Sequence, residues 1–155
     1  MVKILGLPLG TFLVRLGGAI VTGIVTLIIF FYVPKLLYSS VPGLASATGI
    51  TVGDFIYYAV AITILSGVST IYRDHLLGDT AAIANGLTQI YYIYIITNGG
   101  VLSLAISGIT ASINFSTLLY FLITPSAIGV ISTVIRMVSR SATTPFNDRE
   151  QILLR

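Results

Sequence analysis

Apolar residues fill four long segments of the chain, and short polar or charged stretches separate them. The segments are residues 12–33, 54–72, 81–97 and 115–138. A helix of about 20 consecutive apolar residues crosses the hydrocarbon core of a bilayer, and each segment is close to that length. The pattern therefore predicts an all-α, polytopic membrane protein with about four transmembrane helices, which pair naturally as two hairpins in one domain.

The third segment has two interpretations, because Asn98-Gly99-Gly100 interrupts it. An Asn followed by two glycines is typical of a helix end or a kink. In one interpretation a single, strongly tilted helix covers residues 81–107. In the other, which we favour, residues 81–97 form a short span that breaks or kinks near Asn98–Gly100. Residues 101–113 would then form an interfacial or re-entrant half-helix.

The connections and ends follow from their turn residues. Residues 34–53 contain Pro, Gly and small side chains, which predicts a loop after the first span. Thr51 and Asp54 have the spacing of a capping box at the start of the second helix. In the tail, residues 139–155, a short interfacial helix is expected to begin at Thr144 and Pro145.

Charged residues are scarce and unevenly placed. The chain is 55% hydrophobic with a mean hydropathy of +1.00, and no Asp, Glu, Lys or Arg occurs from Thr80 to Ile135. With four spans, seven of the 8 Lys and Arg residues fall on one side and Lys35 alone falls on the other. The positive-inside rule then places both termini in the cytoplasm. A cell-membrane protein, or a membrane-derived extracellular assembly, is expected. The small net charge of +3 predicts no nucleic-acid partner.

The sequence offers little catalytic chemistry. It has no cysteine and a single histidine, which excludes thiol chemistry and thiolate metal sites. No carboxylate lies in the middle of a predicted span, as a proton-coupled exporter would require. No Ser/His, paired-Asp or metal-ligand constellation of an intramembrane enzyme is present. We therefore predict a protein that is not an enzyme, with no catalytic residue, cofactor or metal.

Small and weakly polar residues recur at helical spacing in every span. Such residues let helix backbones approach closely in lipid, where no hydrophobic force drives helices together. Three tyrosines lie near the middle of the third span, where a phenol group is better placed against protein than against lipid. The predicted packing or interface residues are Gly18, Thr22, Thr63, Gly67, Gly86, Tyr91, Tyr92, Tyr94, Gly129 and Thr133.

Two further groups of polar residues have a structural and a functional interpretation. Asn85, Gln89 and Asn98 either link helices by hydrogen bonds or line a polar path. The stretch that contains Arg73, Asp74, His75 and Asp79 is either an ordinary turn, with Asp79 or Thr80 capping the third helix, or a docking loop.

The leading hypothesis is a non-catalytic structural subunit of a larger membrane or membrane-derived assembly, such as a membrane complex, a filament or a virion built from hydrophobic helices. Its partners would be the lipid bilayer and further copies or other subunits. The alternative is a small oligomeric channel or carrier lined by Asn, Gln, Ser and Thr side chains.

Overall fold

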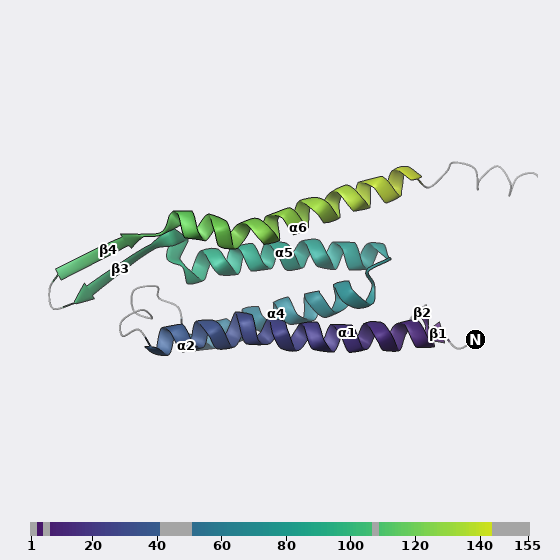
Figure 1. Ribbon diagram of the computed structural model, residues 1–155, viewed down its shortest axis with the longest axis horizontal. Helices are drawn as coiled ribbons and strands as arrows, with labels where there is room; N and C mark the ends of the chain where they lie inside the picture. Colours follow the sequence, from purple (N-terminus) through teal and green to yellow (C-terminus); the bar gives the residue numbers. More distant parts are fainter. Residues whose placement is uncertain (1–2, 5–6, 41–50, 107–108, 144–155) are drawn as a thin grey trace, which may run out of the picture.

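The computed structural model describes residues 3–4, 7–40, 51–106 and 109–143. Its helices run nearly side by side in an open row, and a β-hairpin extends from one end of that row (Figure 1). The elements are β1 (Lys3–Ile4), β2 (Leu7–Pro8), α1 (Leu9–Leu27), the π-helical turn η1 (Ile28–Tyr32), α2 (Val33–Ser40), α4 (Val52–Ile71), α5 (Leu76–Ile96), the 3-10 turn η2 (Asn98–Gly100), β3 (Val101–Ile106), β4 (Ile109–Asn114) and α6 (Ser116–Thr143).

The helices pack in the order of the sequence. The main contacts join α1 to α4, α4 to α5, and α5 to α6, so α1 and α6 form the two edges of the row. Among the described residues, three helices are long and apolar enough to cross a membrane: Leu9–Ser40, Gly53–Ile71 and Ser116–Arg140. The mostly helical fold is thus confirmed, and its apolar helices are compatible with a membrane location.

Helix α5 is not among those three helices, although it has 21 residues. It carries Asp79, Asn85 and Gln89, which lower its hydropathy. It also lies inside the row between α4 and α6, so these polar side chains can face protein instead of lipid. The four-span topology itself stays a prediction.

The predicted end of the first helix at Val33 is wrong. The helix continues through Pro34 to Ser40, and the turn η1 directly precedes Pro34. Proline lacks an N–H and its ring collides with the carbonyl four residues earlier, which here belongs to Phe30. The wider π turn relieves this crowding, and the Tyr92 hydroxyl of α5 donates a hydrogen bond of 2.5 Å to the Phe30 carbonyl. Residues 41–50 of the predicted loop lie outside the described residues.

The predicted break after the third helix is confirmed. Helix α5 ends at Ile96, and Asn98, Gly99 and Gly100 have φ values of 48°, 66° and 85°. Gly100 is required for a second reason, because a Cβ there would lie 2.8 Å from the Cα of Ser116. The start of the helix differs from the prediction, since α5 begins at Leu76 instead of Ala81.

The segment after the break is a β-hairpin, so both helical interpretations of residues 101–113 are wrong. Strands β3 and β4 pair antiparallel from Val101 opposite Asn114 to Ile106 opposite Ile109. Phe115 donates its backbone N–H to the Gly100 carbonyl at 2.8 Å and closes the base of the hairpin. Five residues of the segment 101–114 are β-branched, namely Val101, Ile106, Ile109, Thr110 and Ile113, and β-branched residues suit a pleated strand.

The other two predicted helices are present with shifted ends. Helix α4 begins with the predicted capping box, in which the Thr51 backbone N–H donates to Asp54 Oδ2 at 2.8 Å. Helix α6 covers Ser116–Thr143 and continues through Pro125. It therefore extends past the predicted end at Val138. The predicted interfacial helix at residues 144–155 lies outside the described residues.

An aromatic cluster forms the buried core at the hairpin end of the row. Tyr92 of α5 is only 1% exposed and packs against Phe55 of α4. Phe55 is fully buried, and its ring also makes an edge-on contact with the ring of Tyr38 in α2. The Tyr38 hydroxyl donates to the carbonyl of Ile96 at 2.9 Å, which satisfies the last residue of α5. These contacts attach the α1–α2 helix to α5 across the row.

Candidate polar site between α5 and α6

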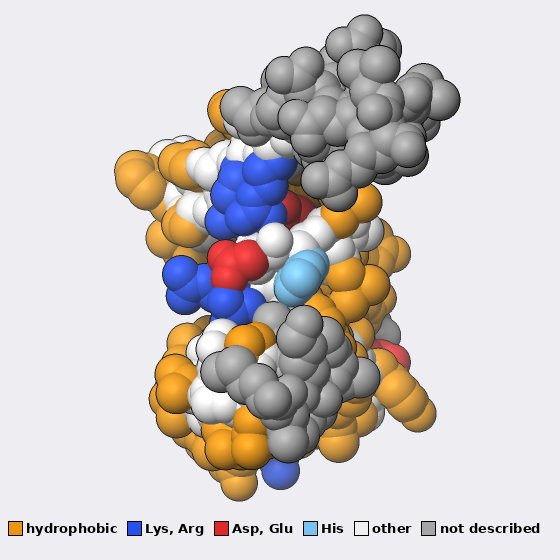
Figure 2. All heavy atoms as spheres, turned by 90° about the vertical axis from the view of Figure 1, so that its right-hand side faces the viewer, with side chains coloured by type: hydrophobic (Ala, Val, Ile, Leu, Met, Phe, Trp, Pro, Cys, Tyr) orange, Lys and Arg blue, Asp and Glu red, His pale blue; other side chains and the backbone are white. Residues whose placement is uncertain are grey.

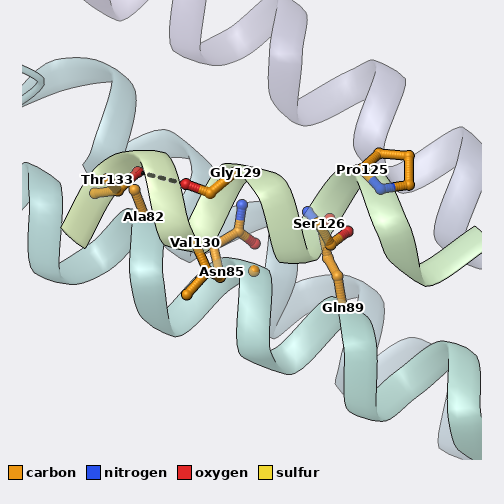
Figure 3. A pocket seen from close by; sticks show the side chains of 9 residues that line it. Ala82, Asn85, Gln89, Pro125, Ser126, Gly129, Val130 and Thr133 are labelled. Atoms are coloured by element: carbon orange, nitrogen blue, oxygen red, sulfur yellow. Dashed lines mark hydrogen bonds between the residues drawn. The ribbon is translucent and has the colours of Figure 1, made fainter. Parts of the chain in front are cut away.

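A polar hollow of about 280 Å³ lies between the middle parts of α5 and α6 (Figure 3). Both helices contribute small or uncharged side chains to it, and these side chains leave the space between the helices unfilled. The lining residues are Ala82, Asn85, Gly86, Gln89, Pro125, Ser126, Gly129, Val130 and Thr133.

One hydrogen bond joins the two walls of the hollow. The Ser126 hydroxyl of α6 donates to Gln89 Oε1 of α5 at 2.8 Å. Ser126 follows Pro125, which supplies no N–H of its own to the helix. The Thr133 hydroxyl is occupied locally, since it donates to the Gly129 carbonyl at 2.8 Å. The hydrogen bond between Gln89 and Ser126 thus links α5 to α6. A link of this kind is the structural one of the two interpretations given for the amides of the third span.

Asn85 is the unsatisfied member of the lining. Within the described part of the chain, its Oδ1 atom is buried and has no hydrogen-bond partner. A buried polar atom left without a partner costs about 1–3 kcal/mol. The wall of the hollow therefore contains a buried acceptor atom whose hydrogen-bonding capacity is not used within the described part of the chain.

The lining defines what the hollow can do chemically. Its polar groups are neutral amides and hydroxyls, which form hydrogen bonds but do not carry charge. Such groups can orient a small uncharged polar group. They do not supply a general acid, a general base or a set of metal ligands.

Gly86 sets the distance between α5 and α6. A Cβ at this position would lie 2.4 Å from Cγ2 of Val130 and 3.4 Å from the carbonyl oxygen of Ser126. No described atom lies within 4 Å of the corresponding position at Gly129, although Gly129 lines the same hollow. Gly86 thus lies in close contact with α6 of the same chain, whereas Gly129 faces open space.

We expect Gly86→Ala to lower the free energy of unfolding by about 1–3 kcal/mol, because either the Val130 side chain must leave its position or α5 and α6 must move apart to admit the methyl group. Gly129→Ala is the matched control. It should be neutral or stabilise the fold by up to about 1 kcal/mol through helix propensity. Denaturant unfolding in detergent micelles, followed by far-UV circular dichroism, measures both. Equal effects of the two substitutions would contradict the close contact at Gly86.

The remaining packing candidates divide between the inside and the outside of the chain. Tyr92 is buried within the chain, whereas Tyr91 and Tyr94 are 56% and 54% exposed in the last two turns of α5. Thr63 has a buried hydroxyl without a described partner and lies against Gly23. The side of α1 that faces α4 is made of Ala19, Gly23 and Thr26, while Gly18, Thr22 and Gly67 are exposed or half-buried.

Asn98 does not join the hollow. It is exposed in η2, and its side-chain N–H donates to the carbonyl of Val101 at 3.1 Å. Its role is therefore local, because it stabilises the turn that leads into the hairpin. The sequence grouped it with Asn85 and Gln89, but the structure brings only those two amides together.

Charged side chains gather at the opposite end of the row from the hairpin (Figure 2). We call this surface the charged end; its described residues are Arg15, Arg73, Asp74, His75, Asp79, Arg136 and Arg140. The predicted docking loop supplies four of these residues, but the structure divides them. Arg73, Asp74 and His75 are exposed in the turn between α4 and α5, whereas Asp79 is buried.

Asp79 is not a helix cap, contrary to one prediction. His75 is the N-cap position of α5, and Asp79 lies at the end of its first turn. Its Oδ1 atom accepts from Arg136 at 2.7 Å and its Oδ2 atom accepts from Arg140 at 2.8 Å. The sequence did contain a signal for this contact, since Asp79 and Arg136 are the two residues that bound the charge-free segment.

A further ion pair of the charged end joins α1 to the α4–α5 turn. The Arg15 guanidinium hydrogen-bonds to Asp74 and also to the carbonyl of Ile71 at 3.1 Å. The hydrogen bond between Arg15 and Asp74 holds the pKa of the Asp74 carboxyl below its ordinary value. A carboxyl with a lowered pKa contributes to stability at neutral pH, and the contribution is lost as the pH falls through that lowered pKa.

Comparisons with protein-family models, with curated proteins and with solved structures gave no match to this chain.

Proposed function

We propose that this protein is a non-catalytic structural subunit of a larger membrane or membrane-derived assembly. In this proposal its four long helices cross the membrane, and both termini lie on the cytoplasmic side with the charged end. Further copies of the chain or other subunits pack against its helices.

The open row of helices is the observation that carries the proposal. Only 11% of the apolar window of Leu9–Ser40 and 11% of that of Ser116–Arg140 is buried within the chain. Both helices are edges of the row, so each offers a long apolar side to lipid or to another helix. Helices that already packed as a closed bundle would bury more of this surface against one another.

Two glycines of α1 favour a protein neighbour over lipid at one edge. Gly10 and Gly17 are seven residues apart and therefore lie on one side of α1. No described atom comes within 4 Å of the place that a Cβ would take at either position. A second helix could approach the backbone closely there, as small residues permit in membranes. The rings of Tyr91 and Tyr94 are more than half exposed and offer further surface to a neighbour of α5.

Native mass spectrometry of the full chain in a mild detergent tests this proposal. We expect a species that contains more than one chain, and we expect Gly17→Leu to convert it to the monomer without loss of helical content. Val60→Leu, an exposed apolar exchange on α4 and away from the side of α1 that carries the two glycines, is the matched control and should leave the assembly intact. A protein that stays monomeric in detergent and in native membranes would refute the proposal.

A small channel or carrier is the second candidate, and the hollow between α5 and α6 favours it. The buried acceptor of Asn85 and the amide of Gln89 would line a path for an uncharged polar solute. Solute flux into liposomes separates the two functions. Saturable flux that is lost in Asn85→Leu would support the carrier and contradict a purely structural role, whereas a tight bilayer would exclude the channel.

A further inference from the structure

Among the described residues of the charged end, positively charged side chains outnumber negatively charged ones. Four arginines, Arg15, Arg73, Arg136 and Arg140, are balanced by Asp74 and Asp79, which leaves a local charge of +2. Figure 2 shows the basic side chains of this end in two groups, with an acidic side chain between them and hydrophobic side chains nearby.

Asp79 fixes the positions of two of these arginines. Its side chain is 1% exposed, and its two oxygens accept one hydrogen bond each from Arg136 and Arg140. The two guanidinium groups are held side by side, because they share one carboxylate. A guanidinium has five N–H donors, so one bond to Asp79 does not exhaust Arg136.

The same arginines remain accessible from outside the chain. The side chains of Arg136 and Arg140 are 48% and 41% exposed, although Asp79 is not. Arg140 also donates to the backbone carbonyl of Arg73 at 3.5 Å, which brings the 71% exposed side chain of Arg73 to the same surface. The exposed guanidinium groups of Arg136 and Arg140 thus flank the buried carboxylate, and the guanidinium group of Arg73 lies at the same end, with its Nε atom 3.9 Å from Asp74 Oδ1.

The position of this surface fits a lipid phosphate. The charge-free segment begins directly after Asp79 and ends directly before Arg136, so the arginines lie where the apolar parts of α5 and α6 stop. In a membrane, the phosphates of the lipid headgroups lie at that level. A guanidinium group can donate two parallel hydrogen bonds to one phosphate group.

We propose that Arg73, Arg136 and Arg140 form a binding site for the phosphate group of an anionic phospholipid, with Asp79 as the residue that positions the last two. The proposal rests on the membrane location given above but not on the assembly role. Its failure would therefore leave the assembly role unaffected.

Lipid titration of the delipidated full chain, followed by native mass spectrometry, tests the site. Phosphatidylglycerol should bind at least about tenfold more tightly than phosphatidylcholine with the same acyl chains. Arg73→Gln should weaken phosphatidylglycerol binding about fivefold, since each cation near a headgroup contributes about that factor. Within the described part of the chain, Asp79 forms its ion pairs with Arg136 and Arg140 and not with the exposed Arg73, so the variant is expected to fold normally.

Lys35→Gln is the matched control, because it removes one cation from the other end of the row, where Lys35 lies over the ring of Phe31. Equal binding of the two lipids, or an equal loss of binding in Lys35→Gln, would overturn the proposal. Inorganic phosphate is the third probe. If it displaced phosphatidylglycerol at millimolar concentration, the site would belong to a soluble phosphate and the lipid assignment would be wrong.

Discussion

Replacing both Arg136 and Arg140 with glutamine is expected to lower the free energy of unfolding by about 3–5 kcal/mol. The reason is the burial of Asp79, because its carboxyl group would lose both guanidinium partners in a place that water does not reach. Removing the partners of a buried charge costs more than removing the whole ion pair, because the remaining charge is left without compensation.

The comparison with a triple variant makes this prediction specific. Adding Asp79→Asn to the double variant removes the buried charge and should recover most of the lost stability. Arg73→Gln is the control for a general loss of positive charge, and it should change stability by less than about 1 kcal/mol because Arg73 is exposed. Denaturant unfolding in micelles measures all three variants. A triple variant that is as unstable as the double variant would show that the buried charge is not the cause.

Replacing Tyr92 with alanine is the second large effect that we expect, at about 3–5 kcal/mol of lost stability. The ring is almost fully buried among Phe30, Phe55 and Tyr58, with centroid distances of 5.7, 6.4 and 5.3 Å. Its removal would open a cavity where α4, α5 and the first helix meet. The same measurement in micelles reports the loss.

Tyr92→Phe separates the hydroxyl from the ring. It should cost about 1–2 kcal/mol, because the Phe30 carbonyl would lose its donor at the place where Pro34 already provides none. Tyr91→Ala is the matched control on the same helix. It should have a much smaller effect on the single chain, since Tyr91 is more than half exposed. A Tyr91→Ala variant as unstable as Tyr92→Ala would contradict the packing described here.

The sequence predicted those parts of the fold that depend on local pattern. Long apolar segments indicated the helices, Thr51 and Asp54 indicated a helix start, and Asn98-Gly99-Gly100 indicated a break. Pro34 indicated a helix end, but the helix continues through it. The Phe30 carbonyl cannot accept a hydrogen bond from Pro34 and accepts one from Tyr92, which lies 58 positions after Pro34 in the sequence. No local pattern contains that information.

The hairpin and the polar site were beyond prediction for related reasons. Residues 101–106 are apolar enough for a membrane helix, and only their pairing with residues 109–114 makes them a strand. Asn85 and Gln89 could be placed one turn apart from the sequence. Their position opposite Ser126 depends on how α6 is aligned along α5, which the close contact at Gly86 determines.

Two of the ion pairs at the charged end, Arg15–Asp74 and Arg136–Asp79, divide the chain into two modules of similar design. Arg15 and Asp74 join the open ends of the α1–α4 hairpin and are 59 positions apart, while Asp79 and Arg136 join those of the α5–α6 hairpin and are 57 positions apart. Each helical hairpin thus carries its own opposite charges at its own ends. Two fragments separated between Asp74 and Asp79 would each retain a complete ion pair, so the chain has a natural point of division for reassembly from halves.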